Sequence, residues 1–428
     1  MKELQEHHAQ VNGMNVHMVQ TDKYKTNTIV LMIKAPLQSE TVSQRAILPH
    51  ILQGGSEKFP TRQQIRSQLD ELYGASMYAD VQKKGEDHVI VFRLDVANEN
   101  FINDPTPLFE KGMELLADVL LHPKLDGQGF AQTVVESEKR SLKQRIQAIY
   151  DDKMRYANMR ITEEMCKNEP FGLLVYGKED GVDTLTSESL YSYYQNMLIE
   201  DEIDLYVIGD LNQEKIKQTI SSQFNFTIER APKKKVHEIT NQPIPSEEKV
   251  VFDEQDVKQG KLHIGYRTYT TYSDKEYYAL QVMNGLYGGF SHSKLFLNVR
   301  EKESLAYYAA SRYESHKGIL MVMSGIEFTN YDKAVRIIKE QMEAMRNGEF
   351  TEDEINQTKA MIKNQLLETV DVAKAYIELL YHNVVSGKER TVEEWLQGID
   401  AVTKEEMVAV ANKLKLDTIY FLKGKEVV

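Results

Sequence analysis

Apolar residues along this chain form short strand-like runs that alternate with amphipathic helical segments. The runs NTIVLMIKAP (27–36) and DHVIVFRLDV (87–96) are dense in aliphatic residues, as expected of strands in a sheet. The segment LFEKGMELLADVLLH (108–122) instead carries its apolar residues at helical spacing. The first half of the chain is therefore predicted to form a sheet accompanied by helices.

The same order of elements appears a second time further along the chain. A strand-like run at 260–268 is followed by a helical segment that ends on two glycines, as the run at 27–36 is in the first half. A strand-like run at 317–326 and a helical segment at 331–348 repeat those at 87–96 and 108–122. Three residues of one helical segment recur in its counterpart: Phe130, Lys139 and Lys143 as Phe350, Lys359 and Lys363. This pattern indicates two copies of one unit.

The duplication predicts an α+β protein made of two homologous domains. The segment 226–250 is charged and lacks sustained periodicity, so we interpret it as a linker between domains 1–225 and 251–428. The predicted strands show strong alternation in their residues and are joined through hairpins and paired helices. This pattern favours an antiparallel-rich mixed β-sheet covered by α-helices in each domain.

Composition narrows the classes of function. The 428 residues carry 52 basic and 65 acidic side chains, and the net charge of −13 argues against a nucleic-acid or anionic-membrane partner. Cys166 is the single cysteine, so the chain forms no internal disulfide. No segment approaches the roughly 18 apolar residues of a membrane span. We therefore expect a cytoplasmic protein that is not inserted in a membrane.

The duplicated unit, with NVREKESLAYY in its second copy, resembles the pitrilysin or insulinase-like metallopeptidase family over essentially the whole chain. The most specific local match is Arg300, Glu301 and Lys302 followed by Leu305, Ala306 and Tyr307. The resemblance is to the half-length form of the family, in which two subunits form a clamshell. It implies that the first domain descends from a zinc-binding domain, in which the metal is bound by an inverted motif, H-x-x-E-H, on a helix.

The zinc motif is degenerate here. Histidines four residues apart on a helix can share a metal ion, and the glutamate beside the second takes a proton from the metal-bound water. In the stretch RAILPHILQGG, the first histidine aligns with Ala46, the glutamate with Pro49 and the second histidine with His50. The family's downstream glutamate aligns with Arg145. The resemblance therefore implies no metal and no general base in this chain.

The sequence indicates no other histidines that could replace the missing zinc ligands. His7 and His8 point in different directions on a helix or a strand, so we interpret them as part of a tail rather than as a metal site. His17 has no companion at ligand spacing. If the helix around Pro49 has its N-cap near Ser43, the proline falls past the first turn and removes a hydrogen bond to the carbonyl group of Arg45.

The resemblance assigns substrate contacts to the second domain. It implies that Arg300 and Tyr307 stabilise charge on the scissile carbonyl oxygen, and that Gly288 and Gly289 contact substrate. Residue types alone also allow Arg300 to pair with Glu301 or with the nearby Glu303, and Tyr307 to pack in a core. The glycines alone also fit a simple turn after a helix.

The sequence thus predicts the non-catalytic subunit of a zinc metallopeptidase pair, which binds extended peptide and completes the site of a zinc-bearing homologous partner. Alone it is expected to hold no zinc and to show no peptidase activity. Two alternatives remain: a peptide-binding scaffold that forms a homodimer, and an active zinc metalloendopeptidase with atypical ligands.

Overall fold

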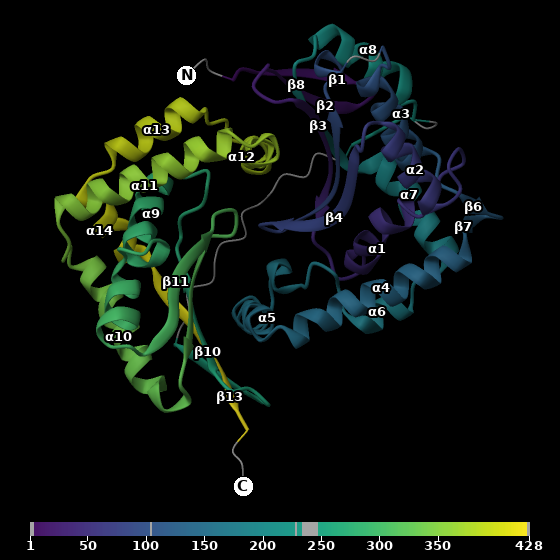
Figure 1. Ribbon diagram of the computed structural model, residues 1–428. Helices are drawn as coiled ribbons and strands as arrows, with labels where there is room; N and C mark the ends of the chain where they lie inside the picture. The colour runs from purple at the N-terminus through teal and green to yellow at the C-terminus, as the bar shows by residue number, and fades with distance from the viewer. Residues whose placement is uncertain (1–3, 103–104, 227–228, 233–246, 426–428) are drawn as a thin grey trace. The chain divides into compact units, whose positions relative to one another are not determined.

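The computed structural model describes residues 4–102, 105–226, 229–232 and 247–425. These residues form two compact units (Figure 1). The first unit contains Met1–Ala148 and Leu173–His237, and the second contains Ile149–Gly172 and Glu238–Val428.

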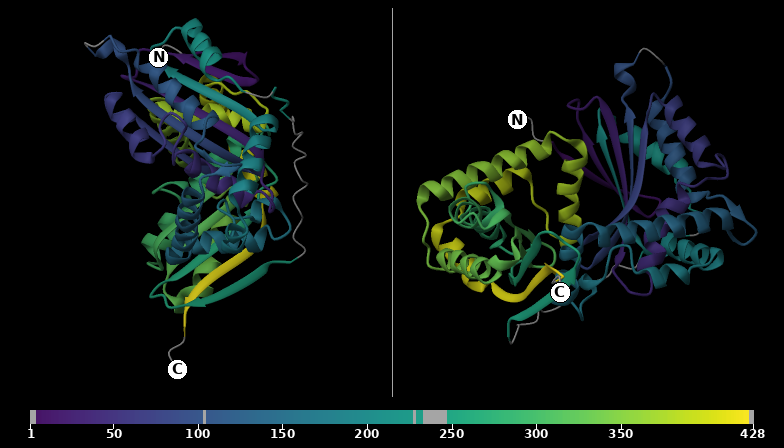
Figure 2. Two further views of the ribbon diagram at one scale, coloured as in Figure 1. Left: turned by 90° about the vertical axis from the view of Figure 1, so that its right-hand side faces the viewer. Right: turned by 60° about the horizontal axis from the view of Figure 1, so that its bottom comes forward.

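The first unit contains a six-stranded sheet in the order β1-β2-β8-β3-β5-β4. Its strands are drawn in purple, blue and teal in Figure 2. Neighbouring strands are antiparallel except for β2 and β8, which are parallel. Helices α1 and α3 pack against β5. The elements are β1 (Glu6–Val11), β2 (Met14–Gln20), β3 (Thr26–Pro36), α1 (Val42–Leu52), α2 (Arg62–Glu71), β4 (Ser76–Lys84), β5 (Asp87–Ala97), α3 (Leu108–Leu121), the short β6 (Leu125–Asp126) and β7 (Gly129–Phe130), α4 (Gln132–Asp151), α6 (Glu179–Asp183), α7 (Ser187–Glu200), β8 (Glu202–Gly209) and α8 (Gln213–Gln223).

The second unit has a five-stranded sheet in the order β11-β12-β10-β13-β9, in which only β13 and β9 are parallel. Read from β9, this order matches that of β2, β8, β3, β5 and β4 in the first unit. Topology therefore confirms the duplication. The elements are α5 (Lys153–Met165), β9 (Lys249–Gln255), β10 (Gly260–Arg267), α9 (Tyr277–Asn284), η3 (Gly285–Gly289), η4 (Phe296–Lys302), β11 (Ala306–Glu314), β12 (Ile319–Ile326), α10 (Tyr331–Arg346), α11 (Glu352–Val370), α12 (Ala373–Ser386), α13 (Val392–Ala401), α14 (Lys404–Lys413) and β13 (Lys415–Gly424).

The two lysine pairs that reveal the duplication make the same bonds in each unit. Lys139 Nζ donates to the carbonyl oxygens of Asp183 (3.2 Å) and Leu185 (2.9 Å), and Lys143 Nζ pairs with the Asp183 carboxylate (2.5 Å). In the second unit, the Nζ atoms of Lys359 and Lys363 reproduce these bonds with Asp400 and Val402. In both units, the repeated lysines thus bind a long helix to the end of a shorter helix, α6 or α13, and to a residue just beyond it.

Helix α5 belongs to the second unit although the first half of the sequence encodes it. Its apolar residues cover the face of the second sheet opposite to α9, α10 and α14. Beyond α5, the Glu169 carboxylate binds Arg267 Nη2 (2.6 Å) and Lys317 Nζ (2.6 Å). The predicted first domain, 1–225, thus differs from the first unit by the segment 149–172, because helical periodicity shows that a helix has an apolar face but not which sheet covers it.

Most of the predicted linker lies outside the described residues, at 233–246. Its described beginning packs on the first unit, where the Arg230 guanidinium donates hydrogen bonds to the carbonyl oxygens of Gly13, Leu198 and Asp201. Its described end belongs to the second sheet, because Lys249 begins β9. Both ends of the predicted linker are therefore parts of folded units.

Candidate functional site

Helix α1 carries the positions that align with the H-x-x-E-H motif. Its N-cap is Thr41, earlier than the predicted Ser43, because the helix begins at Val42. Pro49 lies inside the helix, and the Gln53 N–H still donates to the Pro49 carbonyl oxygen at 3.2 Å. The helix therefore continues past the proline, although position 49 has no N–H to donate to the preceding turn.

A buried arginine beside Ala46 anchors this helix. Arg45 and Ala46 are both fully buried. The Arg45 guanidinium donates hydrogen bonds to the carbonyl oxygens of Ile33 (2.7 Å) and His88 (3.0 Å), the Tyr193 hydroxyl (3.2 Å) and the Asp201 carboxylate. These bonds fix α1 to β3, β5 and the end of α7. The helix that aligns with the zinc motif is thus held by an arginine.

His50, the motif's one remaining ligand type, lies close to an acid on β4. Its Nε2 atom is 3.7 Å from Asp80 Oδ1, and 11% of its side chain is exposed. Asp80 Oδ2 also accepts hydrogen bonds from the Tyr78 hydroxyl (2.9 Å) and the Tyr176 hydroxyl (3.4 Å). Burial opposes ionisation of Asp80, but His50, the Val81 N–H and Tyr78 hold its pKa below the usual value. His50 therefore faces an ionised carboxylate.

Arg145, the residue predicted to align with the family's downstream glutamate, lies on a helix of the first unit. Arg145 is half-buried on α4. On the same helix, the buried Glu138 accepts a hydrogen bond from Arg62 Nη2 at 2.9 Å, and this guanidinium nitrogen also lies 3.2 Å from the His50 carbonyl oxygen. Sequence reasoning missed Glu138 and Asp80, because no spacing rule connects them to His50. Of the four aligned positions, only His50 offers a metal-binding side chain.

Arg300 lies on η4, a π-helical segment. Its guanidinium carbon is 4.5 Å from the centroid of the Phe296 ring. Its Nε atom is 3.6 Å from Glu301, and the side chains of both residues are largely exposed, so this ion pair is weak. The other predicted ion-pair partner, Glu303, instead pairs with a lysine on α10. The π-helical geometry is itself frequent at functional sites.

Tyr307 projects from the edge strand β11, where it is 70% exposed. Ala306 pairs with one residue of β12 and Tyr308 with the next, so Tyr307 is the extra residue of a β-bulge. Ser304, just before the strand, has a left-handed backbone with φ of 50°. A β-bulge changes the direction in which the side chains near it point. The tyrosine is therefore presented to solvent and does not pack in a core.

The two glycines after α9 differ in their surroundings. Both lie on the π-helical segment η3, but Gly288 is buried and Gly289 is exposed. A Cβ atom on Gly288 would lie 2.5 Å from Ser311 Oγ and 2.7 Å from the Ser311 backbone nitrogen. Close packing against β11 thus accounts for Gly288, and substrate contact by the pair stays a prediction.

Replacing Gly288 with alanine is expected to destabilise the protein by about 1–3 kcal/mol, because the added methyl group must displace the backbone of β11. The matched variant Gly289→Ala should cost less, since the nearest atom to its Cβ, the Asn284 carbonyl oxygen, lies 3.2 Å away. Urea denaturation of both variants measures the difference. Equal midpoints for G288A and the parent chain would contradict this packing.

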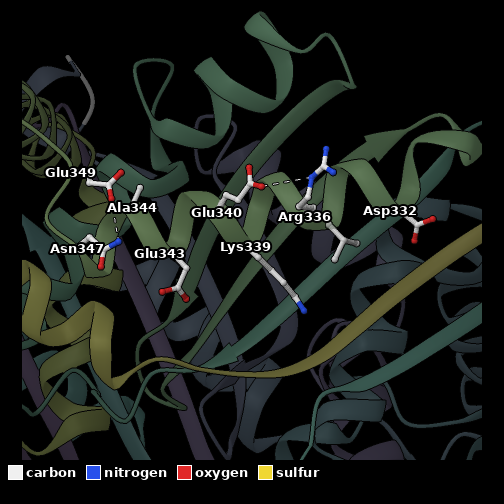
Figure 3. Close-up of a pocket in the computed structure, with 9 residues that line it drawn as sticks. Asp332, Arg336, Lys339, Glu340, Glu343, Ala344, Asn347 and Glu349 are labelled. Atoms are coloured by element: carbon white, nitrogen blue, oxygen red, sulfur yellow. Dashed lines mark hydrogen bonds and ion pairs between the residues drawn. The ribbon is translucent and has the colours of Figure 1, made fainter.

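A charged hollow of about 480 Å³ lies along α10 (Figure 3). Opposite charges along it are paired, as in Arg336 with Glu340 (3.7 Å) and Lys339 with Glu248 (2.5 Å). Its lining side chains are exposed or half-buried, so the hollow is a solvated, ion-paired helix face. The lining residues are Asp332, Val335, Arg336, Lys339, Glu340, Glu343, Ala344, Asn347 and Glu349.

Known proteins with similar sequences identify the family. The sequence model of the family described as "Peptidase M16 inactive domain" matches residues 184–362. A Bacillus subtilis (strain 168) protein named "Probable inactive metalloprotease YmfF" is 52% identical over 414 residues, which cover 97% of this chain and 96% of that protein. This chain belongs to the M16 metallopeptidase family. The resemblance to pitrilysin-like peptidases is thereby confirmed.

Solved structures share the M16 fold over the full length. A conserved protein from Enterococcus faecalis V583 is 34% identical and superposes with a TM-score of 0.91, covering 98% of this chain and 99% of the other. An M16 inactive domain from Pseudomonas fluorescens, 15% identical, covers 99% of both chains with a TM-score of 0.81 and supports the fold alone.

The chain is a non-catalytic M16 homologue. The matching relative and the family model both carry the description "inactive". The predicted alignment to the zinc motif offers a chemical reason, since Ala46, Pro49 and Arg145 cannot supply two metal ligands and a base. Within the described parts of the chain, every helix is too short or too polar to cross a bilayer.

Proposed function

We propose that this M16 homologue is the non-catalytic subunit of a two-chain zinc metallopeptidase. In this pair, a homologous partner with an intact H-x-x-E-H motif holds the metal and the general base. This chain binds the extended peptide and supplies Arg300 and Tyr307 to the partner's site.

The observation that carries the proposal is the exposure of both side chains on irregular backbone. Arg300 lies on a π-helical turn and Tyr307 on a bulge. Among the residues that the structure describes, the guanidinium is held by a weak ion pair and a ring contact alone. Irregular backbone of this kind costs free energy, and it is common where a side chain must be aimed at a ligand. These features support a role in contacting another molecule.

The chemistry requires donors aimed at the scissile carbonyl oxygen. A zinc ion on the partner would polarise that carbonyl group and lower the pKa of its bound water. As water attacks, negative charge develops on the carbonyl oxygen. The Arg300 N–H groups and the Tyr307 O–H group can each donate a hydrogen bond to this oxygen, and a charged donor gives the stronger bond. We therefore assign both residues to oxyanion stabilisation in trans.

Peptide binding is supported by two edge strands. β4 ends the first sheet and β11 ends the second, and each presents an exposed tyrosine, Tyr78 and Tyr307. An extended peptide can add to such an edge through main-chain hydrogen bonds. The same edges support the alternative function, a peptide-binding homodimer without proteolysis.

We also propose a cytoplasmic location. Cys166 is the single cysteine and is buried, so the fold does not depend on an internal disulfide, as is usual for proteins of reducing compartments.

The test compares three samples: this chain alone, a zinc-bearing homologue alone, and an equimolar mixture. Light scattering measures pairing, and a quenched library of extended peptides measures cleavage. We expect a mixed dimer, with cleavage that depends on both chains and is abolished by a chelator.

Two outcomes would overturn the proposal. Cleavage by this chain alone that is lost in His50→Ala would make it an active peptidase with atypical ligands. A homodimer that binds peptide but leaves the zinc-bearing homologue unchanged in activity and mass would favour the scaffold.

A further inference from the structure

The hairpin β1–β2 gathers three potential metal ligands on one face. His8 on β1 lies directly opposite His17 on β2. Glu6 is two residues before His8 and therefore shares its face of the strand. One ligand atom from each of Glu6, His8 and His17 lies within 4.8 Å of the others. The sequence interpretation of His8 as part of a tail is thus wrong, because β1 is a paired strand.

Contacts with the two neighbouring strands, β1 and β8, fix the orientation of His17. Its Nδ1 atom faces Glu6 Oε1 at 2.8 Å, and its Nε2 atom faces Asp204 Oδ1 at 3.1 Å. The imidazole also stacks on Tyr206 with ring centroids 4.1 Å apart. A carboxylate bonded to the far nitrogen of a histidine is the usual support of a metal ligand. Asp204 is placed to give that support.

Charge balance indicates that a divalent cation fits this cluster. Asp204 is fully buried, and its Oδ2 atom has no hydrogen-bond partner. The carboxylates of Glu6 and Asp204 flank the two ring nitrogens of His17. A divalent cation bound beside them would balance the charge of both carboxylates.

We propose that Glu6, His8 and His17 bind one divalent transition-metal ion of the zinc type. Two imidazoles and one carboxylate suit such an ion, and three protein ligands leave a coordination position for water. The ion would take a carboxylate oxygen of Glu6, Nε2 of His8 and Nδ1 of His17, and Asp204 would act as the positioning residue. Binding releases the Nδ1 proton of His17 to solvent, while the Nε2–H bond to Asp204 remains. The site ties the edge strand β1 to β2.

The proposal is tested by titrating the full chain with zinc. Calorimetry monitors the titration in two buffers of different ionisation enthalpy. We expect one zinc per chain, release of about one proton at neutral pH, and a rise in Tm with zinc. Because the metal takes the place of the proton between His17 Nδ1 and Glu6, the affinity for zinc should be lower at lower pH.

The zinc affinities of single-residue variants distinguish binding at this cluster from binding at other histidines. His8→Ala is the decisive change, because 55% of the side chain is exposed and its loss should leave the fold intact. We expect H8A to lower zinc affinity at least tenfold and Asp204→Asn to lower it about 10- to 100-fold. His7→Ala, on the other face of β1, and His50→Ala, on α1, are matched controls that should bind zinc as the parent chain does.

Three results would overturn the metal site: no binding at micromolar zinc, unchanged affinity in H8A, or loss of binding in H7A or H50A. The expected zinc at this hairpin replaces the sequence-based expectation that the chain alone holds no zinc. The site does not depend on the proposed function. H8A should leave cleavage by the mixed pair unchanged, so failure of one proposal is distinguishable from failure of the other.

Discussion

Arg300→Ala is expected to lower the peptidase activity of the mixed pair about 10²- to 10³-fold, the usual effect of removing one oxyanion donor. The loss should appear mainly in kcat, because the guanidinium acts on charge that develops during the reaction. Stability should change little, because 43% of the Arg300 side chain is exposed and its ion pair with Glu301 is weak. Steady-state cleavage by wild-type partner mixed with each variant measures the effect.

Arg336→Ala provides the matched control. Arg336 is also an exposed arginine of the second unit, with 66% of its side chain exposed and an ion pair to Glu340. Tyr307→Phe should lower kcat in the same direction as R300A, since it removes one O–H donor and keeps the ring. Equal activity of R300A and R336A pairs would disprove the role in trans, as would a loss of activity explained wholly by a failure to pair.

Arg45→Met is expected to destabilise the first unit by about 3–5 kcal/mol, the typical cost of breaking a buried ion pair by removing one partner. Methionine fills much of the volume but removes the guanidinium that pairs with the Asp201 carboxylate, which is 11% exposed. It also leaves the carbonyl oxygens of Ile33 and His88 without their donor. Urea denaturation of R45M and of the parent chain measures the loss.

Arg66→Met on α2 is the control for this prediction. Arg66 is exposed, so its replacement should change the free energy of unfolding by no more than about 0.5 kcal/mol. If R45M and R66M unfold at the same urea concentration, the buried network does not hold α1 in place.

The sequence predicted the architecture well because its two copies share local patterns. Strand and helix positions follow from periodicity, and the lysines that revealed the repeat make equivalent bonds in both units. The assignment of α5 could not be predicted, since its apolar face is equally compatible with either sheet. Only the packed structure brings its residues against the buried Tyr420 and Leu422 of β13.

The candidate sites likewise contain some residues that the sequence alone identifies and others that only the folded structure brings together. Ala46, Pro49 and Arg145 were found by alignment to a motif, which needs no tertiary information. The contacts of His50 with Asp80 depend on how α1 meets β4. The cluster of Glu6, His8 and His17 depends on strand register, because a shift by one residue would turn His8 to the other face. Metal ligands that meet only across strands have no fixed spacing in sequence.

The placement of α5 also bears on how such a chain can be divided. A fragment ending at the predicted boundary near residue 225 would carry α5 without the sheet that it covers, and the complementary fragment would expose Tyr420 and Leu422 to water. The two halves of the gene therefore do not encode two independent folding units. A protease that cut between residues 233 and 246 would leave a nicked protein whose second unit still contains segments of both pieces, held by the Glu169 ion pairs and the apolar face of α5.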